Sequence, residues 1–438
     1  MKAPFSQLTA SPLLSNVAWV AGGTAGAQVI TVASAPVLTR LYTPADFGVL
    51  AVFAAILGVI QPLATLTYST TIPLADDDRL AGDVLRLCLL IVVALSAVLF
   101  GALICCGPYI ATRFSVPTVS DYFWLIPLCF LAAGIYETLG AWATKRKWFK
   151  TIAATRVSQG VAATSIRVGL GFFGFQPLGL LLGLLASSVT GSGRMLVKLA
   201  REEHAVFRGT PGPGMLWVAR RYAEFPLFRG CSRLILGIND KLPVFLMASL
   251  FGPDVVGFYG LANTVVAQPM TLIGASVARV YYAEIAEYGR SRPDKIRQLS
   301  LSIMRKMLMV GLIPTCIVII AGPSLFRFLF GEQWEVAGDY ARWLSLIIAV
   351  KFVRTPVIRS LDVFELPRVQ LYLNLLGLGV IVAVFLASAS LRLSSLLTVA
   401  VYSIATAAST AISLLLILAV FRQQLEAMES IESTDRTQ

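Results

Sequence analysis

The chain has 438 residues, of which 57% are hydrophobic and only 14% are charged. Its mean hydropathy is +0.76, whereas soluble domains carry about 25% charged residues, so the composition excludes an ordinary soluble protein and indicates a polytopic membrane protein. The net charge of +12 does not indicate nucleic-acid binding, because most basic residues lie in short loops between apolar runs.

Apolar runs of about 20 residues, long enough to cross a bilayer, follow one another along the chain. The fifth and tenth runs are interrupted by Arg or Lys. We predict an all-α polytopic protein with about twelve transmembrane helices. The predicted spans are 15–38, 46–68, 85–107, 121–143, 151–173, 177–198, 226–250, 255–279, 303–322, 338–358, 368–388 and 395–421.

The second run opens with a helix-start signal, Thr43-Pro44-Ala45-Asp46. Thr43 is the expected N-cap, Pro44 suits the first helical position, and Asp46 can accept from the free N–H groups. Gly252-Pro253-Asp254 gives a similar signal before the eighth run. Pro62 and Pro269 lie at matching places farther along the two runs and are expected to kink them.

Two more sequence echoes follow in the same order. Gly107–Phe114 (GPYIATRF) matches Gly322–Phe328 (GPSLFRF), and Asp121–Leu125 (DYFWL) matches Asp339–Leu344 (DYARWL). Three echoes in register indicate two six-helix lobes related by a pseudo-twofold axis along the membrane normal, which is a transporter signature.

The predicted division is an N-terminal lobe at 1–198, a cytoplasmic linker at 199–223, a C-terminal lobe at 224–421 and a polar cytoplasmic tail at 422–438. The linker is polar and rich in Gly and Pro, which favours a flexible connector, and the tail is expected to fray. An excess of Lys and Arg in alternate loops places both termini in the cytoplasm. The opposite side keeps only Arg40, Arg113, Arg327 and Arg392.

Three stretches carry a family resemblance. The run from Val37 to Asp78 (VLTRLYTPADFGVL and onward), the run from Arg220 to Glu287 and the segment FGEQWEVAGDYARWLSL resemble Wzx-type polysaccharide flippases of the multidrug/oligosaccharidyl-lipid/polysaccharide exporter superfamily. The resemblance implies an inner-membrane protein that moves a polyprenyl-diphosphate-linked oligosaccharide from the cytoplasmic to the periplasmic leaflet. The chain departs from the family pattern near LTYSTTIPL, where Ser69, Thr70 and Thr71 stand in a region that usually holds an acidic residue.

Several charges lie inside the predicted spans, where each costs roughly 2.5–3.5 kcal/mol unless it faces protein or a wet cavity. Arg156 and Arg167 return to one face of the fifth span. In the seventh span Arg233 and Asp240 share a stripe, and Lys241 points about a quarter-turn away. We expect Arg156, Arg167 and Arg233 to line a cationic cavity that binds the diphosphate, because guanidinium groups match phosphate oxygens bidentately.

Further candidates have a structural explanation of equal weight. Lys351 and Arg354 sit one turn apart near the inner end of the tenth span, where Arg354 could simply extend to the interface. Asp240 could neutralise a neighbouring cation. Gln28 and Asn263 could bind sugar hydroxyls, although polar residues between membrane helices often only join helices together.

Alternative functions follow from the same composition. An exporter of drugs or other small molecules is disfavoured, because basic residues in the spans outnumber acids such as Glu137 and Asp240 and would repel a cation. A membrane-embedded polysaccharide polymerase or ligase is disfavoured by the short outer loops. The single His204 and the scattered cysteines indicate no catalytic site, metal site or cofactor. Any coupling would use a proton or sodium gradient; the expected partners are the lipid-linked oligosaccharide, the bilayer and other polysaccharide assembly proteins.

Overall fold

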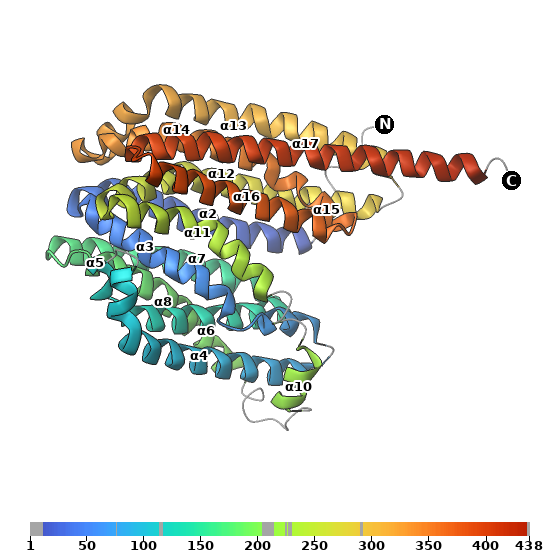
Figure 1. Cartoon of the computed structure of the whole chain (residues 1–438). Helices are drawn as coiled ribbons and strands as arrows, with labels where there is room; N and C mark the ends of the chain where they lie inside the picture. The colour runs from blue at the N-terminus through green and yellow to red at the C-terminus, as the bar shows by residue number, and fades with distance from the viewer. Residues whose placement is uncertain are drawn as a thin grey trace. The chain divides into compact units, whose positions relative to one another are not determined.

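The computed structural model describes residues 12–75, 77–113, 117–203, 214–223, 226, 230–289 and 292–435. Throughout these ranges the regular secondary structure is helical, which confirms the predicted all-α class (Figure 1). By compactness the chain divides into two units, 1–257 and 258–438. The predicted lobe boundaries, with a second lobe starting at 224, stay a prediction.

The helices of the first unit are α2 (Pro12–Leu41), α3 (Pro44–Ile60), η1 (Gln61–Leu63), η2 (Tyr68–Leu74), α4 (Asp78–Arg113), α5 (Pro117–Ser120), α6 (Leu125–Lys145), α7 (Phe149–Phe172), α8 (Leu178–Glu202), α10 (Met215–Arg221) and α11 (Cys231–Phe251). α12 (Pro253–Tyr288) crosses the boundary between the units. The second unit continues with α13 (Pro293–Phe330), η4 (Glu332–Trp334), α14 (Glu335–Val357), α15 (Ser360–Val363), α16 (Pro367–Ser390) and α17 (Ser395–Asp435).

In the described ranges, 10 helices are long and apolar enough to cross a membrane. Every predicted span corresponds to a long helix, but α7 and α14, the fifth and tenth predicted spans, do not meet the combined limits on hydropathy and number of charged residues. The count of about twelve is therefore not confirmed. The charged residues of these two helices include four of the predicted site residues: Arg156, Arg167, Lys351 and Arg354.

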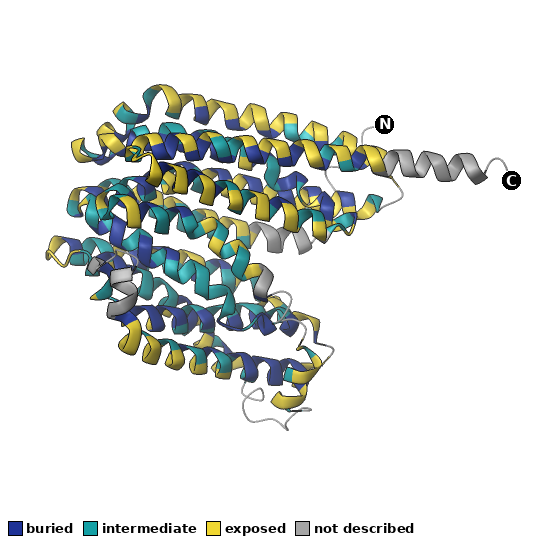
Figure 2. Cartoon of the chain, viewed as in Figure 1, coloured by how far each residue is buried: buried dark blue, intermediate teal, exposed yellow. Residues whose placement is uncertain are grey.

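Exposed residues run along the long helices (Figure 2), and many of them are large and apolar. On α13, for example, Ile313 and Ile320 are 67% and 77% exposed. Large exposed apolar surface is rare on soluble monomers. These faces fit contact with lipid, and the chain is a multi-pass membrane protein.

The predicted start of α3 is confirmed in detail. Thr43 precedes the helix in an extended conformation and Pro44 is its first residue. The Asp46 carboxylate accepts from the Thr43 backbone N–H (2.8 Å) and hydroxyl (2.7 Å), which completes a capping box. α12 begins at Pro253, also as predicted, after Gly252 with a positive φ of 81°.

The two helix starts pack against each other within the first unit. A β-carbon on Gly48 would collide with the carbonyl oxygen of Pro253, and one on Gly257 would collide with the carbonyl oxygen of Pro44. Glycine at both positions lets the backbones of α3 and α12 touch. The two copies of the Pro…Gly pattern thus pack against each other, and the glycine of each copy contacts the proline of the other.

Packing in the first unit follows a chain of neighbours: α2 lies on α7, α7 on α8, α8 on α6 and α6 on α4, while α11 lies on α3. One buried cluster includes Trp142, which is fully buried, and Leu85 and Leu199. In the second unit α13 packs on α14, and α14 packs on α17. There Gly322 meets the backbone of Gly338, so the second echo marks a close helix crossing.

Three local features differ from the sequence expectation. Within the predicted linker, α10 is a helix whose Val218 is buried in the core of the first unit, because an apolar side chain gains from leaving water. The tail does not fray at 422; α17 continues to Asp435. Pro62 ends α3 in a 3₁₀ turn, whereas Pro269 lies inside α12, which continues beyond it.

Candidate functional site

Arg156 projects from α7 over an aromatic ring of α6. Its guanidinium carbon lies 5.2 Å from the centre of the Tyr136 ring, and the residue is exposed. Tyr136 is held in turn by a 3.3 Å hydrogen bond to Thr155. A cation over an exposed ring gains about 0.5–1 kcal/mol, so Arg156 is oriented but keeps its hydrogen-bond donors available.

Arg167 is held between α7 and α8. Its Nε donates to the carbonyl oxygen of Leu180 at 3.4 Å, and its stem packs so closely on Gly183 that a β-carbon there would not fit. The hydroxyl of Tyr42 donates to the backbone oxygen of Arg167 at 2.7 Å. Arg167 therefore has a packing role whether or not it also meets a substrate.

Burial, and then the nearby Asp46 carboxylate, raises the pKa of Tyr42 to about 12. The Tyr42 hydroxyl therefore stays protonated at physiological pH and can donate to the Arg167 backbone. Tyr42 also touches Gly171 and Gly179, so one ring fixes the α2–α3 turn against both α7 and α8.

α11 presents three of the predicted site residues. Arg233 and Asp240 are exposed, and Lys241 is half-buried. The Lys241 stem lies over Gly58 of α3, where a β-carbon would come 2.8 Å from Cε. Arg233 forms no ion pair with the described residues, but it interacts electrostatically with Glu137 of α6.

Beside Arg233, the second predicted span is broken. α3 stops at Ile60, η1 and η2 follow, and Leu66 and Thr67 between them have positive φ angles of 46° and 63°. Non-glycine residues in this region carry strain of about 1–3 kcal/mol, and such strain gathers at functional sites.

A polar cluster, made of Thr65, Ser69 and Glu137, fills this break. Ser69 donates to Glu137 Oε1 at 3.0 Å, and the Thr65 and Ser69 hydroxyls are 2.9 Å apart. Thr65 and Ser69 are almost completely buried. The sequence showed no acid near Ser69; the fold supplies one from α6.

The remaining predicted residues lie on α2, α12 and α14. Gln28 of α2 is half-buried, and Asn263 of α12 and Lys351 of α14 are exposed. Arg354 of α14 is partly buried, and its Nε has no hydrogen-bond partner among the described residues. A buried donor of this kind is costly to leave unpaired, which keeps Arg354 a candidate for an anion. The single cavity predicted to join these residues with Arg156 and Arg233 stays a prediction.

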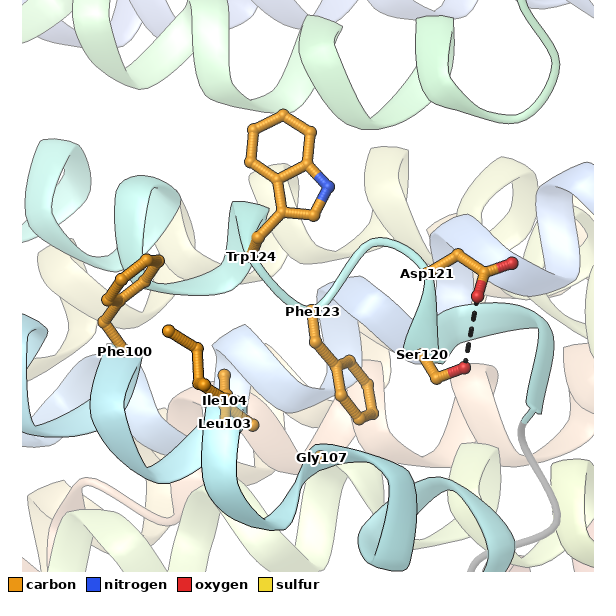
Figure 3. A pocket seen from close by; sticks show the side chains of 8 residues that line it. All are labelled: Phe100, Leu103, Ile104, Gly107, Ser120, Asp121, Phe123 and Trp124. Atoms are coloured by element: carbon orange, nitrogen blue, oxygen red, sulfur yellow. Dashed lines mark hydrogen bonds between the residues drawn. The ribbon is translucent and has the colours of Figure 1, made fainter.

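Two hollows lie elsewhere in the first unit. A cavity of about 320 Å³ beside the ends of α4 and α6 is lined chiefly by apolar side chains, with Ser120 and Asp121 at one side (Figure 3). A second, of about 510 Å³, lies between α2 and α7 and is lined by Trp19 and Lys150. Lys150 Nζ sits 5.5 Å from the Trp19 ring. Of the predicted site residues, none lines either hollow.

No group of three or more His, Cys, Asp or Glu side chains that could hold a metal ion occurs in the described ranges. The chemistry available around α6 and α11 is that of the guanidinium group of Arg233 and the ammonium group of Lys241 near the carboxylates of Glu137 and Asp240. Such an arrangement can bind an anion and exchange a proton.

Comparisons with known proteins agree with this picture. The model of a family described as "Polysaccharide biosynthesis protein" matches residues 37–339. The teichuronic acid biosynthesis protein TuaB of Bacillus subtilis (strain 168) is 26% identical over 156 residues, which are 35% of this chain and 32% of TuaB. The match thus spans about a third of that relative's length.

Solved structures share the fold over nearly the whole chain. An inward-facing multidrug resistance MATE family transporter of the MOP superfamily matches with a TM-score of 0.65 and 13% identity, covering 95% of this chain and 96% of that one. The lipid II flippase MurJ in an inward closed conformation matches with a TM-score of 0.65 and 11% identity, covering 94% and 92%. An outward-facing MATE transporter gives a TM-score of 0.61 at 14% identity, covering 95% of both chains.

Proposed function

Because the chain belongs to the polysaccharide biosynthesis protein family, we propose that it is a transporter that flips a lipid-diphosphate-linked oligosaccharide across the membrane. It acts from the cytoplasmic to the periplasmic leaflet of the inner membrane, with both termini in the cytoplasm. The family match over residues 37–339 carries the proposal. The shared fold with a lipid II flippase supports it.

The charge pattern selects the substrate class. Arg233 and Arg156 are exposed side chains on α11 and α7, which we propose both lie in the membrane, and Arg233 has no ion-pair partner in the described ranges. Placing such a charge in the membrane costs roughly 2.5–3.5 kcal/mol unless it meets water or an anion. A diphosphate provides that anion, and two of its oxygens match one guanidinium.

Export of drugs or other small molecules is the second candidate. The likeness to multidrug resistance transporters of the same fold favours it. A cationic drug would be repelled by Arg156, Arg233 and Lys241, whereas a lipid diphosphate would be attracted to them. A polymerase or ligase would need a catalytic constellation, and the described residues around α3, α6 and α11 suggest none.

The fold supports alternating access as the mode of transport. Alternating access would rock one predicted lobe against the other, with the substrate path between them. The cycle would be coupled to a proton or sodium gradient, and the flipped product would pass to other polysaccharide assembly proteins. A cross-link engineered to lock the lobes on the outer face should stop transport.

Reconstitution distinguishes the two candidates. Proteoliposomes containing a fluorescent polyprenyl-diphosphate trisaccharide should expose the label to an external quencher several-fold faster than empty vesicles. The same vesicles loaded with a cationic dye should show no added efflux. Dye efflux without any flipping of the sugar lipid would support the drug exporter instead.

A further inference from the structure

The carboxylate of Glu137 lies in the middle of α6 and is bound by hydroxyl groups. Ser69 uses its single proton to donate to Glu137 Oε1 at 3.0 Å. Thr65 must then donate to Ser69 across their 2.9 Å contact, which gives a chain that runs Thr65 to Ser69 to Glu137. Both hydroxyl-bearing residues are almost completely buried, so this chain is shielded from bulk water.

The backbone that carries the hydroxyls is unusual for a membrane segment. Leu66 and Thr67 adopt positive φ angles between η1 and η2, where a continuous helix would be expected. Non-helical backbone at membrane depth is tolerated where it is buried in protein or lines a cavity, and broken helices in transporters hold substrates and coupling ions. The strained backbone places the Thr65 and Ser69 hydroxyls beside the Glu137 carboxylate.

Glu137 forms no ion pair with a described residue. Arg233 of α11 influences it electrostatically, but no ion pair joins Glu137 to any described residue. From α4 the facing titratable group is the buried thiol of Cys88, and from the α3–η2 segment the neighbours are the amide of Gln61 and the two hydroxyls.

The cations of the other helices packed on α6 are engaged elsewhere. Arg156 of α7 lies over the Tyr136 ring, and Lys198 of α8 bonds to Thr151 at 2.9 Å. The acid at the start of α3, Asp46, is likewise engaged, because it caps its own helix. Arg233 is therefore the nearby cation that is most affected when the charge of Glu137 changes on gaining or losing a proton.

We propose that Glu137 is the proton-carrying residue of the transport cycle and that its protonation state controls how strongly Arg233 binds an anionic lipid headgroup. This inference rests on the proposed function. The ionised carboxylate offsets the positive field of Arg233 and weakens anion binding. When the carboxylate takes one proton from water it becomes neutral, and Arg233 is left to the diphosphate.

Linkage makes the effect reciprocal. If protonation of Glu137 strengthens headgroup binding by some factor, the bound headgroup strengthens proton binding by the same factor. The hydroxyl chain suits both states, since Ser69 donates to the carboxylate and can accept from the carboxylic acid after its hydroxyl rotates. Release of the headgroup on the other side then favours release of the proton there.

The surroundings favour a proton over a metal cation. Hard cations prefer six or more oxygen ligands, whereas the described neighbours of Glu137 are the hydroxyl that it accepts from, a second hydroxyl, one amide and a guanidinium. The guanidinium would repel a sodium ion. A proton needs only the carboxylate oxygen.

Two measurements on the full-length protein test the proposal. In proteoliposomes, wild-type flipping of a lipid-diphosphate-linked trisaccharide should change several-fold when a pH gradient is imposed, whereas Glu137→Gln should flip at a rate independent of the gradient. In detergent, infrared difference spectra should show one protonated-carboxyl band that titrates in wild type and is missing in Glu137→Gln. Glu332→Gln, which changes an exposed acid outside this cluster, serves as the matched control and should behave like wild type.

The outcomes separate the two proposals. No flipping by wild type would overturn the proposed function, whereas the infrared band would still report on Glu137. Wild-type flipping that ignores the pH gradient, or a Glu137→Gln variant that still responds to it, would overturn the role of Glu137. A response to a sodium gradient at equal pH that Glu137→Gln abolishes would overturn the assignment of a proton. Should Glu137→Gln fail to fold, Ser69→Ala replaces it and is expected to shift the pH midpoint of flipping; an unchanged midpoint would contradict the proposal.

Discussion

Gly48 of α3 lies so close to Pro253 of α12 that a β-carbon on Gly48 would collide with the Pro253 carbonyl oxygen. Gly257 stands in the same relationship to Pro44. Each helix start thus supplies a proline carbonyl to the other and a glycine to receive one. The reciprocal contact gives a physical reason for two similar sequence signals about 200 residues apart.

Gly48→Ala and Gly257→Ala should both destabilise the protein, because the added methyl group must displace backbone rather than a mobile side chain. Overpacking of this kind costs about 1–3 kcal/mol of unfolding free energy. Thermal unfolding in detergent micelles would measure the loss. Gly101→Ala is the control, since a β-carbon at Gly101 meets open space; equal effects at all three positions would contradict the tight crossing.

Tyr42→Phe should lower the free energy of unfolding by about 0.5–1.5 kcal/mol near neutral pH, because the hydrogen bond to the Arg167 backbone is lost. Tyr372→Phe on the exposed face of α16 should cost little. Thermal unfolding of both variants beside wild type checks the difference.

The raised pKa of Tyr42 also predicts a pH dependence. A group whose pKa is higher in the folded state adds stability that is complete below its unfolded pKa of 10.0 and is lost as pH rises to about 12. Wild type should therefore lose more stability than Tyr42→Phe between these pH values. Parallel stability curves for the two proteins would refute this account of the buried hydroxyl.

Arg233→Ala should slow flipping on the order of tenfold or more, since hydrogen bonds to a charged group contribute about 1.5–3 kcal/mol. Arg233→Lys should restore only part of the rate, because the bidentate fork is lost. Neither change should reduce membrane insertion or thermal stability. Arg327→Ala, which removes a cation paired with Glu332 on the surface, is the matched control and should stay near the wild-type rate.

Both ends of the linker between the predicted lobes should face the cytoplasm. A reporter fused after Gly209, which lies outside the described residues, should be active if it is a reporter that functions in the cytoplasm. Alkaline phosphatase activity at this point would contradict the predicted topology.

The docking of α10 on α4 further predicts that Val218→Asp lowers stability, because the charge would enter the core of the first unit.

Helix starts could be predicted from the sequence because their signals are local. The capping box joins Thr43 to a residue three positions away, and Pro44 fixes its own φ angle. The length and hydropathy of a span can also be read from neighbouring residues alone, which is why each predicted span corresponds to a long helix. Where charges enter a span, as in α7 and α14, composition alone could not establish that it crosses the membrane.

The polar cluster could not be predicted in the same way. Ser69 and Glu137 are separated by 68 residues, and only the packing of α6 on η2 brings them together. The positive φ angles of Leu66 and Thr67 fall on residues without a glycine signal, so the break looked like the end of one apolar run. Pro62 predicted a kink in the helix there, but it did not predict that two 3₁₀ helices would follow. The grouping of Arg156, Arg167 and Arg233 in one cavity depends on how the helices meet around the substrate, and it stays a prediction.

The most direct test of the account compares two lipids in the same proteoliposomes. One is a fluorescent polyprenyl-diphosphate trisaccharide, and the other is the same trisaccharide attached to the same polyprenyl chain without phosphates. Wild type should flip the diphosphate lipid at least tenfold faster, and Arg233→Ala should lose most of that preference. Equal rates for the two lipids in wild type would contradict the claim that cationic side chains in the membrane select a lipid diphosphate.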